Sequence, residues 1–293
     1  MADNTTCSIQ EALIWATERL ATAGCETPRL DAEILLCECA GMERAFLLAH
    51  GSEAVPADAW TQFQAWIARR ERREPVAYIT GHREFYGLDF VVTPAVLVPR
   101  PETEHLVDEV LALARARYRA NQTLLIADVG TGSGAIAIAL AAHLPHAQVC
   151  ALDASREALE VAWRNADRHG VLGRMCLVQS DLLEHLPWAV DILVANLPYV
   201  ADEEWPALAP EIRFHEPVHA LRGGANGLDL IRRLLGQAPA HLRPGGAVVL
   251  EIGAGQAAGV RRAAQAAFPD AHIRVAQDYA GLDRVVVVQT PWA

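Results

Sequence analysis

The sequence has few of the features that mark secreted, metal-binding or membrane-spanning proteins. Its six cysteines form no CxxC pair, which favours free thiols in a reducing compartment over disulfides or a zinc site. It has no run of about 18 apolar residues, so no membrane span is expected. The first residues lack the basic and apolar regions of a signal peptide. We therefore expect a soluble, cytoplasmic protein without a metal.

Basic residues are also in deficit. The chain has 25 Lys and Arg against 36 Asp and Glu, which gives a formal net charge of −11. A molecule of that charge repels a phosphate backbone, so nucleic acid is disfavoured as a partner. The 52% of hydrophobic residues suffice for a large core, and the length suits about two domains.

The pattern of apolar residues changes along the chain. Residues 1–75 show helical spacing, with a capping box at Ser8 and Glu11, and predict a small helical domain. The charged run Arg69–Glu74 is most simply a solvated helix end, with a binding patch as the less favoured alternative. Aromatic and β-branched residues interrupted by glycines predict a β-hairpin linker over 76–100. These features place the second domain at 101–293.

In this second domain, apolar strands alternate with helices, which predicts an α/β fold with a doubly wound parallel sheet. A terminal antiparallel hairpin, as in the class I methyltransferases, is expected from two final strands joined by a short turn. The predicted strands are Leu124–Val129, Ala147–Asp153, Met175–Ser180, Val190–Ala195, Ala247–Ile252, His272–Gln277 and Arg284–Gln289. The predicted helices lie near Glu104–Ala116, Gly134–Leu144, Ser155–Arg168, Gly227–His241 and Gly255–Phe268.

A glycine-rich loop follows the first of these strands. Its members are Gly130, Thr131, Gly132, Ser133 and Gly134, and glycines here let a backbone approach a ligand closely. Asp153, at the end of the next strand, can accept both hydroxyls of an adenosine ribose. Asp181, after the third strand, can accept from an adenine amino group. We expect Asp128 to reach the methionine amino group; the alternative is that it caps the glycine-rich loop or the helix. The GxGxG spacing and the terminal hairpin favour S-adenosylmethionine over NAD.

The strand at Val190–Ala195 stops abruptly at Asn196-Leu197-Pro198-Tyr199. The Asn196 side-chain oxygen and the Leu197 carbonyl can accept both N–H bonds of a planar amide or a nucleobase amine. Tyr199 can pack against its plane, and Pro198 stiffens the turn. This grip would aim the nitrogen lone pair at a sulfonium methyl group without a metal or an obligatory general base. The alternative is an ordinary Asn-Pro turn with a core tyrosine.

Two prolines hold Arg100 in a stiff, extended segment before Glu102. Such an arginine is a candidate for a substrate contact. A salt bridge to an adjacent glutamate is an equal alternative.

With these motifs the chain resembles the N5-glutamine methyltransferases of peptide chain release factors over nearly its full length. The resemblance implies methyl transfer from S-adenosylmethionine to the glutamine of the Gly-Gly-Gln motif in class 1 release factors, with S-adenosylhomocysteine as product. It implies that the helical domain helps to dock the release factor, and we expect a monomer. The motifs that carry it are Tyr78–Gly81, Glu84–Gly87, Val98–Glu104, the glycine-rich loop, Asn196–Tyr199, Glu216-Pro217, Ala220-Leu221 and Gly223–Asp229. The implied cofactor positions are Gly130–Gly134, Asp153, Asp181, Leu182 and Asn196, and we expect Asn196–Tyr199, Arg100 and Glu102 to bind substrate.

Two positions depart from the family pattern, and other functions stay open. Leu197 stands where the family usually has proline, and Leu182 where relatives often have an aromatic residue. The nearest alternative is the glutamine methyltransferase of a large-subunit ribosomal protein. That group typically has Ser-Pro after the Pro-Arg pair, so Arg100–Glu104 of this chain favours the release-factor group. The tetrapeptide also occurs in adenine-N6 nucleic-acid methyltransferases. A non-enzymatic adenosine-binding module is a further alternative.

Overall fold

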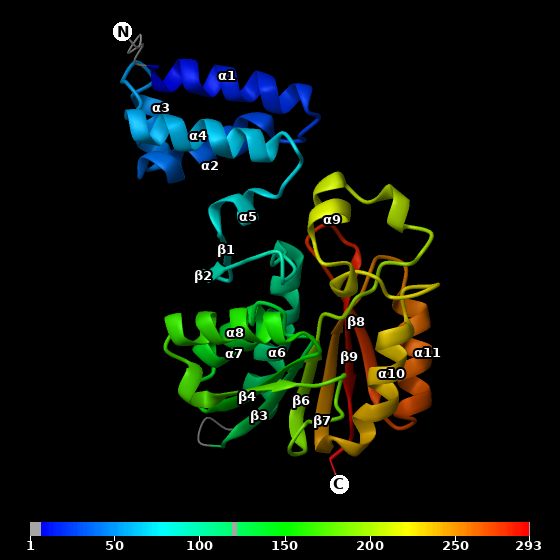
Figure 1. The fold of residues 1–293 in the computed structure, drawn as a ribbon. Coiled ribbons are helices and arrows are strands. Elements are labelled where there is room, and N and C mark those ends of the chain that lie inside the picture. Colours follow the sequence, from blue (N-terminus) through cyan, green and yellow to red (C-terminus); the bar gives the residue numbers. More distant parts are fainter. Residues whose placement is uncertain (1–6, 119–121, 293) are drawn as a thin grey trace. The chain divides into compact units, whose positions relative to one another are not determined.

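The computed structural model describes residues 7–118 and 122–292 (Figure 1). The chain divides into two compact units. The first unit contains the residues up to Gly81 together with Ala209–His215, and the second contains His82–Leu208 and the residues from Glu216 onward.

The first unit is helical. Its helices are α1 (Ile9–Thr22), α2 (Pro28–Ala40), α3 (Arg44–Ala49), α4 (Ala57–Arg70), α5 (Val76–Thr80) and α9 (Pro210–His215). The predicted capping box is confirmed, because Glu11 N–H donates to Ser8 Oγ and Ser8 N–H donates to the Glu11 carboxylate. Buried side chains such as Leu13, Leu35 and Phe63 fill the core between α1, α2 and α4.

The charged run at the end of α4 is not simply solvated, as the sequence had suggested. Arg70 is buried, and its guanidinium donates to Asp31 of α2 and to Glu211 of α9, each at 2.8 Å. Arg73 adds a bidentate pair with Glu211 at 2.7 Å. The partners lie far away along the chain, which is why the local sequence pattern missed them.

The predicted β-hairpin linker is shorter than expected. Residues 76–80 form α5, which begins after Pro75 and ends at Gly81 in a left-handed conformation. Only β1 (His82–Phe85) and β2 (Leu88–Val91) form the hairpin. A proline before a helix and a glycine after it are ordinary boundary signals, so this helix could have been predicted from the sequence.

The second unit is built on one sheet of seven strands in the order β5-β4-β3-β6-β7-β9-β8. The strands are β3 (Leu124–Val129), β4 (Ala147–Asp153), β5 (Met175–Gln179), β6 (Val190–Ala195), β7 (Leu242–Glu251), β8 (His272–Gln277) and β9 (Asp283–Gln289). All pairings from β5 to β7 are parallel, whereas β9 is antiparallel to both β7 and β8. The predicted class I methyltransferase sheet with its terminal hairpin is confirmed. Strand β7 begins at Leu242. The sequence predicted a later start, at Ala247, because Pro244-Gly245-Gly246 resembles a loop.

Helices cover both faces of this sheet (Figure 1). The side chains of α6 (Glu104–Arg117) and α7 (Ala135–His143) pack with one set of alternating strand residues, including Ile126 and Val194. Those of α10 (Asp229–Gln237) and α11 (Ala257–Ala267) pack with the opposite set, including Ala127 and Val248. Helix α8 (Arg156–Arg168) follows β4. The direction of winding reverses between β3 and β6, and ligands of such sheets bind at this point, beyond the carboxyl ends of the strands.

Candidate active site

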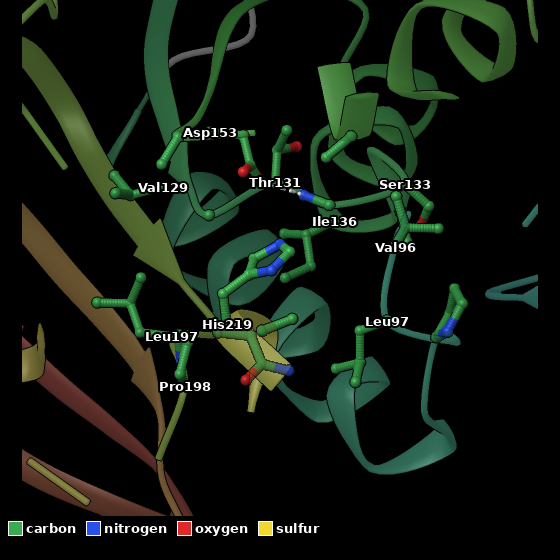
Figure 2. A pocket seen from close by; sticks show the side chains of 18 of the residues that line it. Val96, Leu97, Val129, Thr131, Ser133, Ile136, Asp153, Leu197, Pro198 and His219 are labelled. Atoms are coloured by element: carbon green, nitrogen blue, oxygen red, sulfur yellow. Dashed lines mark hydrogen bonds between the residues drawn. The ribbon is translucent and has the colours of Figure 1, made fainter. Parts of the chain in front are cut away.

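A cavity of about 210 Å³ opens at the carboxyl ends of β3, β4 and β6 (Figure 2). It lies wholly within the second unit. The predicted site residues that line it are Arg100, Gly130, Thr131, Gly132, Ser133, Asp153, Asp181, Leu182, Asn196, Leu197 and Pro198. Four predicted residues are outside its lining: Glu102, Asp128, Gly134 and Tyr199.

The glycine-rich loop forms a tight bend between β3 and α7. Gly130, Gly132 and Gly134 all have positive φ. At Gly134 a Cβ would lie 2.9 Å from Ile138 Cδ1 and 3.2 Å from Ala162 Cβ, so this position also needs glycine to let the loop pack against α8. The bend turns the backbone of the loop toward the cavity.

Asp153 is held between this loop and the start of α8. Its Oδ2 accepts the Gly132 N–H at 2.9 Å and its Oδ1 accepts the Ser155 N–H at 2.9 Å. Burial raises the pKa of Asp153, and these hydrogen bonds oppose the rise. Each carboxylate oxygen has two lone pairs, so both oxygens can accept a further hydrogen bond from a ligand.

Asp128 takes the capping role that the sequence had left open. Its Oδ2 accepts from the Thr131 hydroxyl at 2.6 Å and from the Ala137 N–H at 3.2 Å. The side chain is fully buried, which raises the pKa of Asp128 to about 7. Among the described residues, its Oδ1 has no hydrogen-bond partner. Asp128 therefore ties the glycine-rich loop to α7 and retains one free acceptor.

Asp181 and Leu182 follow β5 and form another wall of the cavity. The Asp181 carboxylate accepts from Arg233 of α10 at 2.7 Å and is half exposed. Leu182 is buried with φ of 52°. A left-handed backbone conformation costs a leucine about 1–2 kcal/mol. The packing around Leu182 therefore compensates for this backbone strain.

Asn196 lies directly after β6, and its Nδ2 donates to the Thr103 hydroxyl at 3.1 Å. Leu197 and Pro198 line the cavity beside it (Figure 2). Tyr199 follows them and is partly buried. Its hydroxyl donates to Glu251 Oε1 at 3.3 Å, and its carbonyl accepts from Gln256 at 2.8 Å. Hydrogen bonds of Asn196 and Tyr199 thus hold the two ends of the tetrapeptide in place.

Arg100 lines the cavity and also forms an ion pair, but not with an adjacent glutamate. Its partner is the buried Glu216, far along the chain. Burial raises the pKa of Glu216, and the Arg100 guanidinium opposes this rise. Glu216 Oε2 has no hydrogen-bond partner in the described part of the chain.

Comparisons with known proteins agree with this fold. Residues 11–81 match the family model described as PrmC N-terminal domain, and residues 126–215 match a methyltransferase domain. The release factor glutamine methyltransferase of Geobacter sulfurreducens is 42% identical over 281 residues, which cover 95% of each chain. That of Moorella thermoacetica is 45% identical over 278 residues, 94% of this chain and 96% of the relative. The chain belongs to the release factor glutamine methyltransferase family.

A solved structure supports the fold alone. A methyltransferase from Pyrococcus furiosus matches 78% of this chain and 98% of its own, with a TM-score of 0.53 and 19% identity. The family membership confirms the resemblance that the sequence motifs had suggested and makes this chain an enzyme of the methyltransferase class. Methyltransferases of this class use S-adenosylmethionine.

Several residues that line the cavity of this methyltransferase were not predicted. They are Phe85, Val96, Leu97, Thr103, Ile136, His219 and Leu230. The His219 imidazole projects into the cavity (Figure 2), and its electrostatic interaction with Asp153 opposes the rise that burial causes in the pKa of Asp153. His219 lies between Glu216-Pro217 and Ala220-Leu221, so the motif that carries the resemblance already marked its segment. Thr103 likewise lies inside Val98–Glu104.

Within residues 7–118 and 122–292, no three or more His, Cys, Asp or Glu side chains are grouped to hold a metal ion. None of the helices described there combines the length and hydropathy that a membrane crossing needs.

Proposed function

We propose that this methyltransferase transfers the methyl group of S-adenosylmethionine to the side-chain nitrogen (N5) of the glutamine in the Gly-Gly-Gln motif of class 1 release factors. The observation that carries the proposal is the placement of Asn196. It lines the same cavity as the glycine-rich loop and Asp153, and Thr103 holds its side-chain nitrogen. One cavity therefore offers an adenosine site and an amide site side by side.

The residues of the cavity fit the cofactor. We assign the ribose hydroxyls to Asp153, whose oxygens have lone pairs left over, and the adenine to Asp181 and Leu182. Asp181 would share its carboxylate between the adenine amino group and Arg233. The glycine-rich loop from Gly130 to Gly134 would hold the methionine part, with Asp128 behind it. The cofactor supplies a methyl carbon activated by a positively charged sulfur.

On the substrate side, the chain has to bind and orient a weak nucleophile. Asn196 Oδ1 and the Leu197 carbonyl would accept the two N–H bonds of the glutamine amide, which raises the electron density on its nitrogen. This grip would orient the lone pair of the nitrogen toward the methyl group that the cofactor supplies. Pro198 limits movement of the turn, and Tyr199 supports it from behind. Arg100 and Glu102 are proposed to contact the substrate loop at the mouth of the cavity.

The partner and setting are part of the same proposal. The helical domain would dock the release factor, and the enzyme would act in the cytoplasm as a monomer. The net charge of −11 supports a protein substrate over a nucleic acid.

The test is methyl transfer from labelled S-adenosylmethionine to three substrates in parallel: a class 1 release factor, a large-subunit ribosomal protein and nucleic acid. We expect label on the release factor, and peptide mass spectrometry should place one methyl group on the loop glutamine. A release factor with that glutamine replaced is the matched control. Label on the ribosomal protein or the nucleic acid would contradict the substrate assignment.

Asp153→Ala is expected to weaken cofactor binding by about 10- to 100-fold. The reason is the loss of charge-assisted hydrogen bonds to the ribose, worth about 1.5–3 kcal/mol. Isothermal titration calorimetry measures the Kd for S-adenosylmethionine. Asp167→Ala is the matched control, because Asp167 is exposed on α8 and does not line the cavity. An unchanged Kd for Asp153→Ala would reject the ribose role.

A further inference from the structure

Two walls of the cavity come from segments that are far apart in the sequence. One wall is the glycine-rich loop after β3, which includes Ser133. The other wall follows the hairpin: Val91 ends β2, and the chain after it supplies the lining residues Ala95, Val96, Leu97, Pro99 and Arg100. Figure 2 shows Ser133 of the first wall and Val96 and Leu97 of the second. The width of the cavity therefore depends on what joins these two segments.

Asn165 of α8 joins them through three hydrogen bonds. Its Oδ1 accepts the Val91 N–H at 2.8 Å, and its Nδ2 donates to the Val91 carbonyl at 3.0 Å. The same Nδ2 donates to the Ser133 carbonyl at 2.9 Å. Asn165 is fully buried, at 0% exposure. One side chain thus bonds both backbone polar groups at the end of β2 and one carbonyl of the glycine-rich loop.

These partners fix the direction of the Asn165 side-chain amide. A backbone N–H can only donate, and a carbonyl can only accept. An amide that was turned over would place Nδ2 against the Val91 N–H and Oδ1 against two carbonyls. All three hydrogen bonds would then be lost together in a site without water access, which is costly for buried polar groups. Only one orientation of Asn165 therefore suits its surroundings.

Helix α8 contacts both segments on either side of Asn165. One turn earlier, Ala162 lies so close to the loop that a Cβ at Gly134 would be 3.2 Å from the Ala162 Cβ. One turn later, Arg168 forms an ion pair with Asp89 of β2. Asn165 lies between these two contacts and has hydrogen bonds to both the loop and the hairpin.

We propose that Asn165 is a positioning residue that holds the hairpin segment and the glycine-rich loop at the spacing that the cofactor needs. Asn165 does not itself line the cavity. It acts through Ser133 and through the chain that follows Val91. A site that is ordered in advance binds its ligand more tightly, because less conformational freedom is lost on binding. This inference rests on the part of the proposed function that places S-adenosylmethionine in this cavity.

The coupling between the two segments works in both directions. A ligand that steadies the glycine-rich loop should also steady β2, since both are bonded to the same side chain. Strand β2 contributes no residue to the cavity lining, so a ligand in the cavity has no direct means to protect it. Protection of β2 by a bound cofactor would therefore report on Asn165.

The binding test uses S-adenosylhomocysteine and the full-length protein, without any methyl acceptor. Asn165→Asp keeps the shape and one acceptor but loses both N–H bonds, and Asn165→Ala loses all three hydrogen bonds. We expect the Kd from calorimetry to rise on the order of 10-fold in each variant. The measurement is made well below the unfolding temperature of each variant, where a role in folding alone would leave the Kd unchanged.

Arg168→Ala is the matched control for these variants. It removes a contact between the same helix and the same hairpin, but Arg168 has no hydrogen bond to the glycine-rich loop among the described residues. We expect its Kd to stay within about twofold of the unmodified protein. An equal rise of the Kd in Arg168→Ala would overturn the specific role of Asn165.

A second measurement uses the unmodified protein and does not depend on whether the variants fold. Hydrogen exchange followed by mass spectrometry compares the free and the S-adenosylhomocysteine-bound protein. We expect slower exchange in peptides that cover the glycine-rich loop and also in those that cover β2. In Asn165→Asp the loop should remain protected by the ligand, whereas the protection of β2 should disappear. Exchange in β2 that ignores the ligand in the unmodified protein would overturn the inference.

The outcomes separate this inference from the proposed function. If the unmodified protein does not bind S-adenosylhomocysteine, the proposed function fails, because the cavity is then no cofactor site. If the protein binds it and the two Asn165 variants bind equally well, only the positioning role fails.

Discussion

Replacing Asn196 with alanine is expected to lower kcat by about 10²- to 10³-fold. Asn196 is the one side chain of the tetrapeptide that can accept an N–H bond of the glutamine amide from within the cavity, and Thr103 already holds it in place. Removal of a preorganised hydrogen-bonding group at a reacting centre typically costs a factor of about this size. The measurement is single-turnover transfer to a release factor at saturating cofactor, which separates chemistry from binding.

Asn226→Ala is the matched control for this variant. Asn226 is also followed by a turn, but its side-chain oxygen accepts from Leu228 N–H and Arg232, and it is outside the cavity lining. We expect its kcat to stay within about twofold of the unmodified enzyme. If Asn196→Ala also stays within that range, the amide grip at residue 196 is wrong.

Replacing Glu211 with alanine is expected to lower the free energy of unfolding by about 3 kcal/mol. Glu211 accepts hydrogen bonds from Arg70 and Arg73, and Arg70 is buried. Loss of one partner of a buried ion pair leaves an uncompensated charge, which costs about 3–5 kcal/mol. We expect the low end because Arg70 keeps Asp31. Denaturant unfolding of the full-length chain measures the loss, and Glu203→Ala, at an exposed position of the same segment, is the control.

The same ion pair gives a pH dependence with a defined sign. Its two arginines hold the pKa of Glu211 down at about 2, below the value of about 4.3 for an unfolded glutamate. Its contribution is therefore present above about pH 4.3 and is lost as the pH falls toward 2. The stability difference between the unmodified chain and Glu211→Ala should shrink over that interval. A difference that stays constant from pH 7 down to 2 would contradict the assignment of the charge.

The features that could be predicted from the sequence are those that depend on residues close together along the chain. The sheet strands follow from apolar runs, and the glycine-rich loop follows from its spacing. The placement of Asp153 and Asn196 at the cavity follows from one rule, that parallel strands end at a common edge. Ion pairs between residues far apart in the sequence leave no comparable pattern in the sequence. Arg100 could be identified as rigid, but its partner Glu216 could not be identified from the local pattern.

The same limit applies to Thr103. In the sequence it is one residue of a motif that begins a helix, and nothing local distinguishes it from a cap. Its hydroxyl accepts a hydrogen bond from Asn196, which lies 93 residues further along the chain. Conversely, α5 had clear boundary signals in Pro75 and Gly81 and was still assigned to a hairpin. The β-branched and aromatic composition of this stretch favours a strand, whereas its end residues favour a helix.

The membership of α9 in the helical unit restricts how this protein can be taken apart. The backbone crosses from one unit to the other three times, after Gly81, after Leu208 and after His215. A truncation that removes the residues up to Gly81 would therefore leave Glu211 in the remaining chain without Arg70 and Arg73. In a chimera with a relative, the residues up to Gly81 and the segment Ala209–His215 would have to come from the same parent. Because the excursion to α9 starts from the segment that follows Tyr199, a cut or insertion in this excursion also alters the chain that leaves the Asn196–Tyr199 turn.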